Sequence, residues 1–147
     1  PHQVEVDVRR AEQVGWECVH NAGSVFDPGD ASLFFDDLLP GWYDDWVTAE
    51  RERLGQLRLS FLEAITYALL RQGAVVDALD VALRLVAGDP LREQSQRALI
   101  SVYRASGSVG QSVRQLEVYR ALLREAIGCE PPEALVEYAS SPVAVSP

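Results

Sequence analysis

Two pairs of adjacent aspartates and one cysteine–histidine pair are the residues of this chain that could do metal chemistry. Carboxylates, thiolates and imidazoles are the side chains that hold metal ions in proteins. Cys18 and His20 lie two positions apart on an expected helix, so their side chains would point to different faces. Asp36-Asp37 and Asp44-Asp45 are adjacent acids at helix starts, where the helix dipole stabilises negative charge without any metal. The sequence therefore predicts no metal site.

Catalytic arrangements and phosphate-binding loops are not predicted either. The two histidines, His2 and His20, have no serine, cysteine or carboxylate at a catalytic spacing. The run Gly107-Ser108-Val109-Gly110 is rich in glycine, but it lacks the lysine and the preceding strand of a phosphate-binding loop. We therefore expect neither an enzyme nor a cofactor-binding protein, with no catalytic residues.

The most distinctive local feature is a cluster of aromatic and acidic residues: Trp42, Tyr43, Asp44, Asp45 and Trp46. A Pro40-Gly41 turn precedes this cluster, and an Arg/Glu-rich helical pattern follows it. Wide rings beside acids at a helix start are typical of a point where one helical layer docks on another. The five residues are candidate structural or interaction residues, either core or contact surface. We expect Trp46 to be at least half buried.

The charge of the chain is distributed unevenly. All 13 basic residues are arginine, and the formal net charge is −9. Residues 1–50 hold 11 acidic residues against Arg9 and Arg10, so the whole excess lies there, and residues 51–147 are balanced. Duplex DNA binding requires a basic face that neutralises phosphates. We therefore expect this chain itself not to bind DNA.

The chain is expected to be cytoplasmic and to make no membrane contact. Cys18 and Cys129 lie far apart and follow no metal or redox spacing, as free thiols in a reducing compartment do. No stretch approaches the roughly 18 apolar residues of a membrane span. No charged segment followed by an apolar block indicates a signal peptide.

The hydrophobic pattern predicts a series of helices separated by Gly and Pro. A short edge strand at Val4–Val8 and a helix at Val8–His20 come first. A long helix follows over Gly41–Gln72, and the next one has Leu79, Ala82, Leu83 and Val86 on one face. Asp89-Pro90 is typical of an N-cap and a first-turn proline. The expected helices after Gln72 are Val75–Ala87, one from Asp89-Pro90 through Tyr103, Val109–Ile127 and Glu133–Ala139.

Part of the sequence repeats at a spacing of 34 residues, which is the period of tetratricopeptide hairpins. Gly73 matches Gly107 at this offset, and small residues follow each glycine: Ala78 matches Ser112. We expect Ala78 to lie at a close helix crossing beside Phe61, Leu62 and Ile65. The predicted fold is all-α, a tetratricopeptide-like stack of antiparallel hairpins forming a right-handed α-solenoid, capped by the Asp30–Glu50 region.

Three stretches, in order, resemble the bacterial transcriptional activator domain of the Streptomyces antibiotic regulatory protein family. They are Leu38–Leu59, the string Asp89-Pro90-Leu91-Arg92-Glu93, and the string Tyr119-Arg120-Ala121-Leu122-Leu123-Arg124-Glu125 running into Gly128 and Pro131. The resemblance covers about Val4 to Tyr138. One departure is the turn Gly73-Ala74-Val75-Val76, which is more apolar than the polar turns usual in the family.

The resemblance implies a domain organisation and a function. Residues 1–8 would be the end of, or linker from, an upstream winged-helix DNA-binding domain, residues 9–139 the activator domain, and residues 140–147 a flexible tail. Since the chain contains no Met, we expect it to be a piece of something longer or to have been trimmed. The implied role is a regulatory module that mediates self-association or contacts with the transcription machinery, with DNA reached only through the upstream domain. The alternative is a free-standing helical-repeat adaptor that binds a peptide.

Helical-repeat stacks bind partners along an inner groove, lined here by the first helix of each hairpin. Arg58, Arg92 and Arg104 lie on those helices and are candidate groove residues, or else scattered solvent-facing arginines. An arginine-lined groove beside the acidic residues 1–50 indicates an acidic or mixed-charge peptide partner. The acidic N-terminal segment of a second copy is one such partner.

Overall fold

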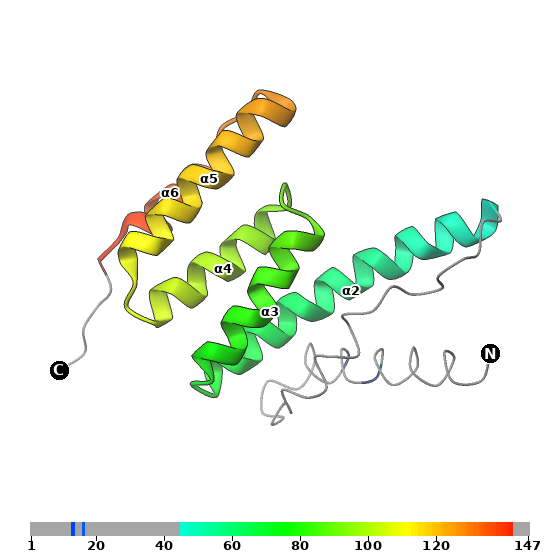
Figure 1. The fold of residues 1–147 in the computed structure, drawn as a ribbon, viewed down its shortest axis with the longest axis horizontal. Helices are drawn as coiled ribbons and strands as arrows, with labels where there is room; N and C mark the ends of the chain where they lie inside the picture. Colours follow the sequence, from blue (N-terminus) through cyan, green and yellow to red (C-terminus); the bar gives the residue numbers. More distant parts are fainter. Residues whose placement is uncertain (1–12, 14–15, 17–44, 143–147) are drawn as a thin grey trace.

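A stack of antiparallel helices makes up the part of the chain that the computed structural model describes, which is Gln13, Trp16 and residues 45–142. Five helices lie within residues 45–142, and no strand occurs there: α2 (Asp45–Arg71), α3 (Val75–Gly88), α4 (Glu93–Ala105), α5 (Val109–Ile127) and α6 (Glu133–Ser140) (Figure 1). Each helix packs on the next, and α4 also packs on α2 and on α6. The predicted all-α, tetratricopeptide-like stack of hairpins is confirmed.

The two hairpin turns are built alike, as the 34-residue repeat predicts. Gly73 and Gly107 both have a φ of 75°, a left-handed conformation that glycine adopts without steric cost. The Ala74 amide donates to the Leu69 carbonyl at 3.0 Å, and the equivalent Ser108 amide donates to the Tyr103 carbonyl at 2.8 Å. This bond closes the C-terminus of a helix and turns the chain back. The repeat is therefore one of backbone geometry as well as of residue types.

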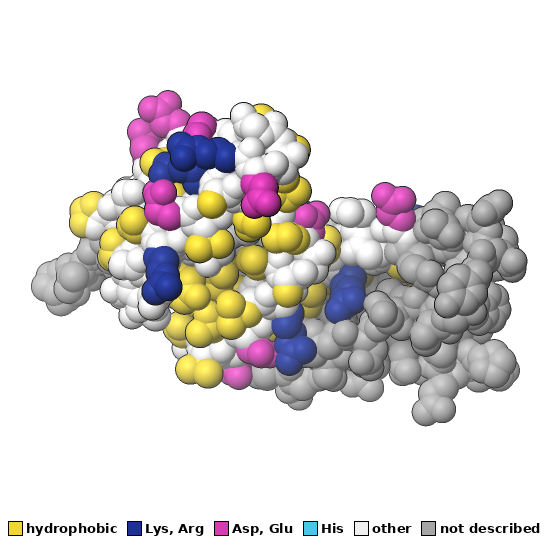
Figure 2. Space-filling model, turned by 45° about the horizontal axis from the view of Figure 1, so that its top comes forward, with side chains coloured by type: hydrophobic (Ala, Val, Ile, Leu, Met, Phe, Trp, Pro, Cys, Tyr) yellow, Lys and Arg dark blue, Asp and Glu magenta, His cyan; other side chains and the backbone are white. Residues whose placement is uncertain are grey.

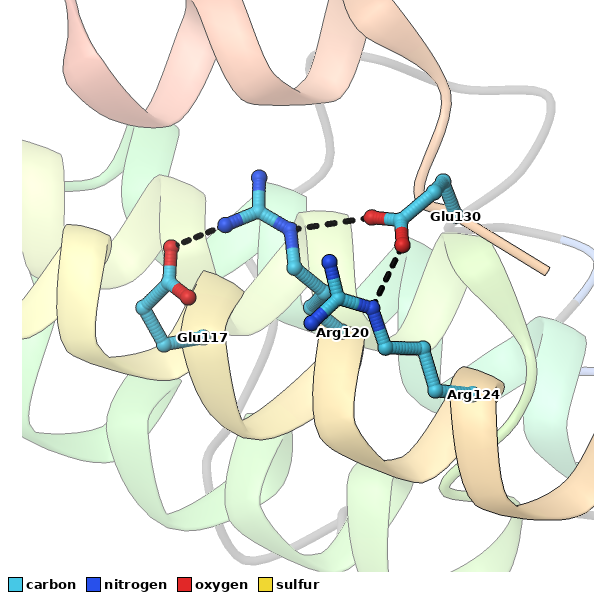
Figure 3. Close-up of polar contacts among 4 residues, drawn as sticks. All are labelled: Glu117, Arg120, Arg124 and Glu130. Carbon is cyan, nitrogen blue, oxygen red and sulfur yellow. Dashed lines mark hydrogen bonds and ion pairs between the residues drawn. The ribbon is translucent and has the colours of Figure 1, made fainter. Parts of the chain in front are cut away.

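A network of charged side chains surrounds the turn between α5 and α6. Gly128 again has a positive φ, 68°. Glu130, just after this turn, accepts from Arg124 Nε at 2.5 Å and pairs with Arg120 Nε at 3.2 Å (Figure 3). Arg120 also pairs with Glu117 one turn earlier. The hydrogen bond with Arg124 and the charges of both arginines hold the pKa of Glu130 below its usual value of 4.5.

The buried side chains form two hydrophobic clusters that meet at α4. One cluster lies between α2, α3 and α4, and the other lies between α4, α5 and α6. α4 contributes Leu99 and Val102 to the first and Ile100 to the second. Ala78 is fully buried in the first cluster together with Phe61, Leu62 and Ile65, as predicted. α4 is thus the central helix of the described stack.

The predicted inner face of α3 is partly wrong. Ala82 is buried as expected, but Leu83 is 47% exposed, and Leu79 and Val86 are only partly buried. The buried face instead consists of these four residues: Ala78, Val81, Ala82 and Leu85. The sequence misleads because α3 carries two apolar stripes, and only one of them faces α2 and α4.

The start of α4 also differs from the prediction. Asp89 does not cap the helix; its carboxylate accepts from the Leu91 amide at 3.2 Å, and the helix begins at Glu93. Gln96, fully buried, donates to the Pro90 carbonyl at 2.7 Å and accepts from Gln115 at 2.8 Å. The hydrogen bond from the Leu91 amide to the Asp89 carboxylate favours a turn at Asp89-Pro90. The buried Gln96 side chain holds this turn against the stack.

Several predictions concern residues outside the described part. The strand at Val4–Val8, the capping segment up to residue 44, and Trp42, Tyr43 and Asp44 lie there. Of the predicted helix Val8–His20, only Gln13 and Trp16 are described, and both are helical. Asp45 and Trp46 open α2, but the side chains of residues 45–51 are outside the description, so the burial of Trp46 stays a prediction.

Candidate interaction face

The helices lie in two layers. α4 contacts both α2 and α6, whereas α3 packs on α2 and α4, and α5 packs on α4 and α6. In Figure 1, α3 crosses in front of α2, and α5 lies in front of α6. We call the surface of α2, α4 and α6 the inner face, and the surface of α3 and α5 the outer face. In helical-repeat proteins the surface made by stacked repeats is where partners bind.

A row of three hydroxyl groups crosses the inner face: Tyr67 of α2, Ser101 of α4 and Tyr138 of α6. The Tyr138 hydroxyl donates to Ser101 Oγ at 3.1 Å, and Ser101 Oγ donates to the Arg97 carbonyl at 2.8 Å. Burial raises the pKa of Tyr67, while its hydrogen bond with Ser101 acts in the opposite direction. A serine hydroxyl accepts two hydrogen bonds and donates one. Ser101 therefore accepts from Tyr138 and joins α4 to α6.

Two arginine–glutamate pairs lie on α4 or between α4 and α2. Arg92 Nη2 donates to Glu63 Oε2 at 3.0 Å, and their side chains are only 19% and 25% exposed. Arg97 pairs with Glu93 one helical turn earlier, at 2.8 Å. The first pair joins α4 to α2 and is partly shielded from water. The second pair is more open and leaves charge of both signs on this face.

Arg104 holds the other end of the inner face to α6. Its guanidinium lies over the Tyr138 ring, 4.7 Å from the ring centroid, and its Nη1 donates to the Ser141 carbonyl at 2.6 Å. A cation over an aromatic face is an attractive contact. Ser141, the C-cap of α6, also hydrogen-bonds Glu137 through its amide at 2.9 Å. The predicted tail boundary at residue 140 thus falls within this capped end, and residues 143–147 lie outside the description.

Arg58 lies apart from the other two predicted groove arginines. It lines a cleft of about 250 Å³ between α2 and the end of α3. Both acidic and basic side chains line this cleft: Glu52, Asp89, Arg58 and Arg84. A side chain at Gly88 would meet Leu59 Cδ2 at 3.0 Å, so glycine permits the close approach of α3 and α2 there. The structure therefore brings Arg92 and Arg104 to the inner face, and places Arg58 at a separate cleft.

The hydroxyl row was not recognised from the sequence. One signal for it exists, because Tyr67 and Ser101 are 34 residues apart and thus occupy the same position in successive hairpins. Tyr138 gives no such signal, since it lies 37 residues beyond Ser101. α5 has 19 residues whereas α3 has 14, so the position of α6 that meets Ser101 comes three residues later than the repeat predicts. That shift depends on the tertiary packing of α6.

Comparison with known proteins identifies this kind of stack. The family model of the bacterial transcriptional activator domain matches residues 22–141, well over half of the chain. The chain belongs to this family. The match includes all five described helices, and with them the hydroxyl row and both inner-face arginines.

One curated relative of this bacterial transcriptional activator domain is Regulatory protein AfsR of Streptomyces coelicolor. The two are 32% identical over 109 residues, which is 71% of this chain but only 11% of the relative. Together, the two comparisons support a domain of the Streptomyces antibiotic regulatory protein type. The chain thus corresponds to a small part of this relative.

Membership of this family places the domain among components of transcription regulators, and the family is not an enzymatic one. Within the described residues, no group of three or more His, Cys, Asp or Glu side chains could hold a metal ion. None of the described helices is long and apolar enough to cross a bilayer.

Proposed function

We propose that this domain is the protein-interaction module of a transcription activator, and that its inner face binds a helix or an extended segment of the transcription machinery. The observation that supports this proposal is the hydroxyl row of Tyr67, Ser101 and Tyr138. The three residues come from three helices, all three are partly exposed, and a hydrogen bond joins Ser101 of α4 to Tyr138 of α6. Tyrosines, with an apolar ring and a polar tip, are frequent anchors in protein interfaces.

The charges around the row favour an acidic or mixed-charge segment as the partner. Arg92 is the N-cap residue of α4, and Arg97 and Arg104 lie on this helix; Glu63 and Glu93 pair with Arg92 and Arg97. The Arg97 side chain is 36% exposed, whereas the Arg92 side chain is 19% exposed. Arginine is suited to such contacts, since its planar fork binds carboxylates in a bidentate manner. Arg92 and Arg104 would support the face from within, and Arg58 would act at the separate cleft.

We also propose the domain organisation in which residues 1–8 lead from an upstream winged-helix domain, residues 9–139 form the activator domain, and residues 140–147 form a tail. The relative named above is a regulatory protein of which the matched region is only 11%, which supports a domain embedded in a longer regulator. The aromatic cluster of Trp42, Tyr43, Asp44, Asp45 and Trp46 would be a second contact or docking point. DNA would be bound by the upstream domain alone.

The test separates transcription activation from DNA occupancy in the native regulator. Arg97→Glu reverses the charge of the inner face, and Arg114→Glu makes the same change on an exposed position of α5 as a matched control. We expect Arg97→Glu to reduce activation of a target promoter several-fold while promoter occupancy stays unchanged. Arg114→Glu should behave like the wild type in both measurements.

Two outcomes would reject the proposal. Full activation by Arg97→Glu would exclude the inner face as the contact surface. Loss of promoter occupancy in parallel with activation would instead indicate an effect on the DNA-binding domain.

If the inner face binds the acidic N-terminal segment of a second copy, Arg97→Glu will lower the sedimentation coefficient at low salt and leave purified RNA polymerase binding unchanged.

A further inference from the structure

A second apolar stripe runs along α3 on the outer face, apart from the stripe that is buried. Val76, Leu79, Leu83 and Val86 form it, at alternating spacings of three and four residues. Val76 is 81% exposed and Leu83 is 47% exposed, whereas Leu79 and Val86 lie partly buried at its inner edge. This spacing is the seam with which one helix packs along another. The stripe has the pattern of a helix contact, yet no described helix covers it.

Other apolar side chains are exposed on the domain. Figure 2 shows hydrophobic side chains gathered on one face of the described part, with charged side chains around them. Leu91, in the turn after α3, is 38% exposed, and Val118 of α5 is 47% exposed. A contiguous apolar area with a polar border is typical of an interaction site.

The charges of α3 are arranged so that they complement those of a second, antiparallel copy of the same helix. Asp77 and Asp80 lie in its first half and Arg84 in its second half; Arg84 pairs with Asp80 of the same helix at 3.1 Å, and both side chains remain about half exposed. Two such helices packed antiparallel about a two-fold axis near residue 81 would place Val76 against Val86, and Leu79 against Leu83. The same arrangement brings Asp80 of each copy near Arg84 of the other. A parallel arrangement would place like charges together.

We propose that the outer face of this domain is a self-association surface, at which α3 of one copy packs antiparallel against α3 of a second copy. The partner is thus another copy of this chain, and the contact is isologous, as in most homodimers. This inference is independent of the inner face, which would remain open in the dimer for the partner proposed above. A contact of one helix pair falls below about 1,200 Å², so the dimer should be weak and concentration-dependent.

Sedimentation velocity of the 147-residue chain from about 1 µM to about 1 mM tests the proposal. Leu83→Glu places a charge in the middle of the seam, and we expect it to weaken self-association at least about ten-fold. Ile127→Glu is the matched control, because Ile127 is 61% exposed at the end of α5, away from the α3 seam. Circular dichroism and thermal unfolding of each variant verify that the fold is retained.

Charge exchange tests the antiparallel pairing. Asp80→Arg and Arg84→Asp each leave α3 with charges of one sign at these positions, so each variant alone should self-associate about two- to five-fold more weakly. An equimolar mixture of the two should restore association to the level of the wild type, because opposite charges again face each other. Recovery in the mixture is not expected from a change in the stability of either variant.

A wild type that stays monomeric over the whole range would overturn the proposal. Equal association of Leu83→Glu and Ile127→Glu would also overturn it, since the dimer would then form elsewhere. Weak association of both charge variants without recovery in the mixture would reject the antiparallel arrangement. The inner-face variant Arg97→Glu should not alter this dimer, so the two proposals can fail separately.

Discussion

At the scale of single residues, small side chains let α3 and α5 pack closely against their neighbouring helices. Ala78 and Ser112 are equivalent positions of the two hairpins, and neither exposes any surface. Ser112 also donates to the Ala139 carbonyl at 2.5 Å, which joins α5 to α6. The second hairpin therefore has a serine where the first has an alanine, and the serine hydroxyl binds the next helix, α6.

Ala78→Leu should lower the free energy of unfolding by about 1–3 kcal/mol, because three extra carbon atoms must fit among Phe61, Leu62 and Ile65. Ala121→Leu, at an exposed position of α5, should change it by less than about 0.5 kcal/mol. Urea unfolding monitored by circular dichroism measures both values. Equal tolerance of leucine at the two sites would show that α3 does not cross α2 at Ala78.

Glu130 makes a stability contribution that depends on pH. The pKa of Glu130 is lowered in the folded protein by its hydrogen bond with Arg124 and by the charges of Arg124 and Arg120. Its contribution is therefore fully present above the usual value of 4.5 and is lost as the pH falls through the lower, folded value. The wild type should lose its advantage over Glu130→Gln on acidification below that value. A difference between the two proteins that stays constant down to acid pH would contradict this.

At the scale of elements, the turns decide the path of the chain. Gly107 has a φ of 75° and no atom near its missing Cβ, so backbone strain is the only cost of a side chain there. Gly107→Ala should destabilise by about 1–2 kcal/mol. Gly110→Ala, three residues later within α5, should stabilise by about 0.5–1 kcal/mol, since alanine favours the helix. Thermal unfolding of both variants gives the comparison, and shifts of the same sign would refute it.

The elements also show what the sequence can and cannot predict. Gly73 and Gly107 were predictable because a left-handed turn requires glycine, and because the repeat marks both. The buried face of α3 was not, since periodicity finds both apolar stripes of the helix without indicating which one is covered. Tyr138 was missed because α5 is longer than α3, which shifts the register of α6. In each case, the information lacking from the sequence is which surface a helix presents to its neighbours.

At the scale of the whole molecule, charge limits the partners of the chain. With a formal net charge of −9, and with its arginines in residues 51–147 balanced by acids, it presents no excess of positive charge to a polyanion. We expect no mobility shift of duplex DNA at physiological salt and at chain concentrations below about 1 µM. A salt-sensitive shift in that range would mean that the arginines gather into a basic face when DNA is present.

The equivalence of the turns at Gly73 and Gly107 has a consequence for how such a chain can change during evolution. Both turns use the same amides and carbonyls, offset by 34 residues, as expected after tandem duplication of an ancestral hairpin. Gain or loss of a whole hairpin would preserve the backbone geometry of these turns. Loss of one residue within α4 would rotate all later positions by about 100°. Ile100 and Val102 would then no longer face their own clusters. We therefore expect insertions and deletions to be tolerated better between hairpins than within a helix.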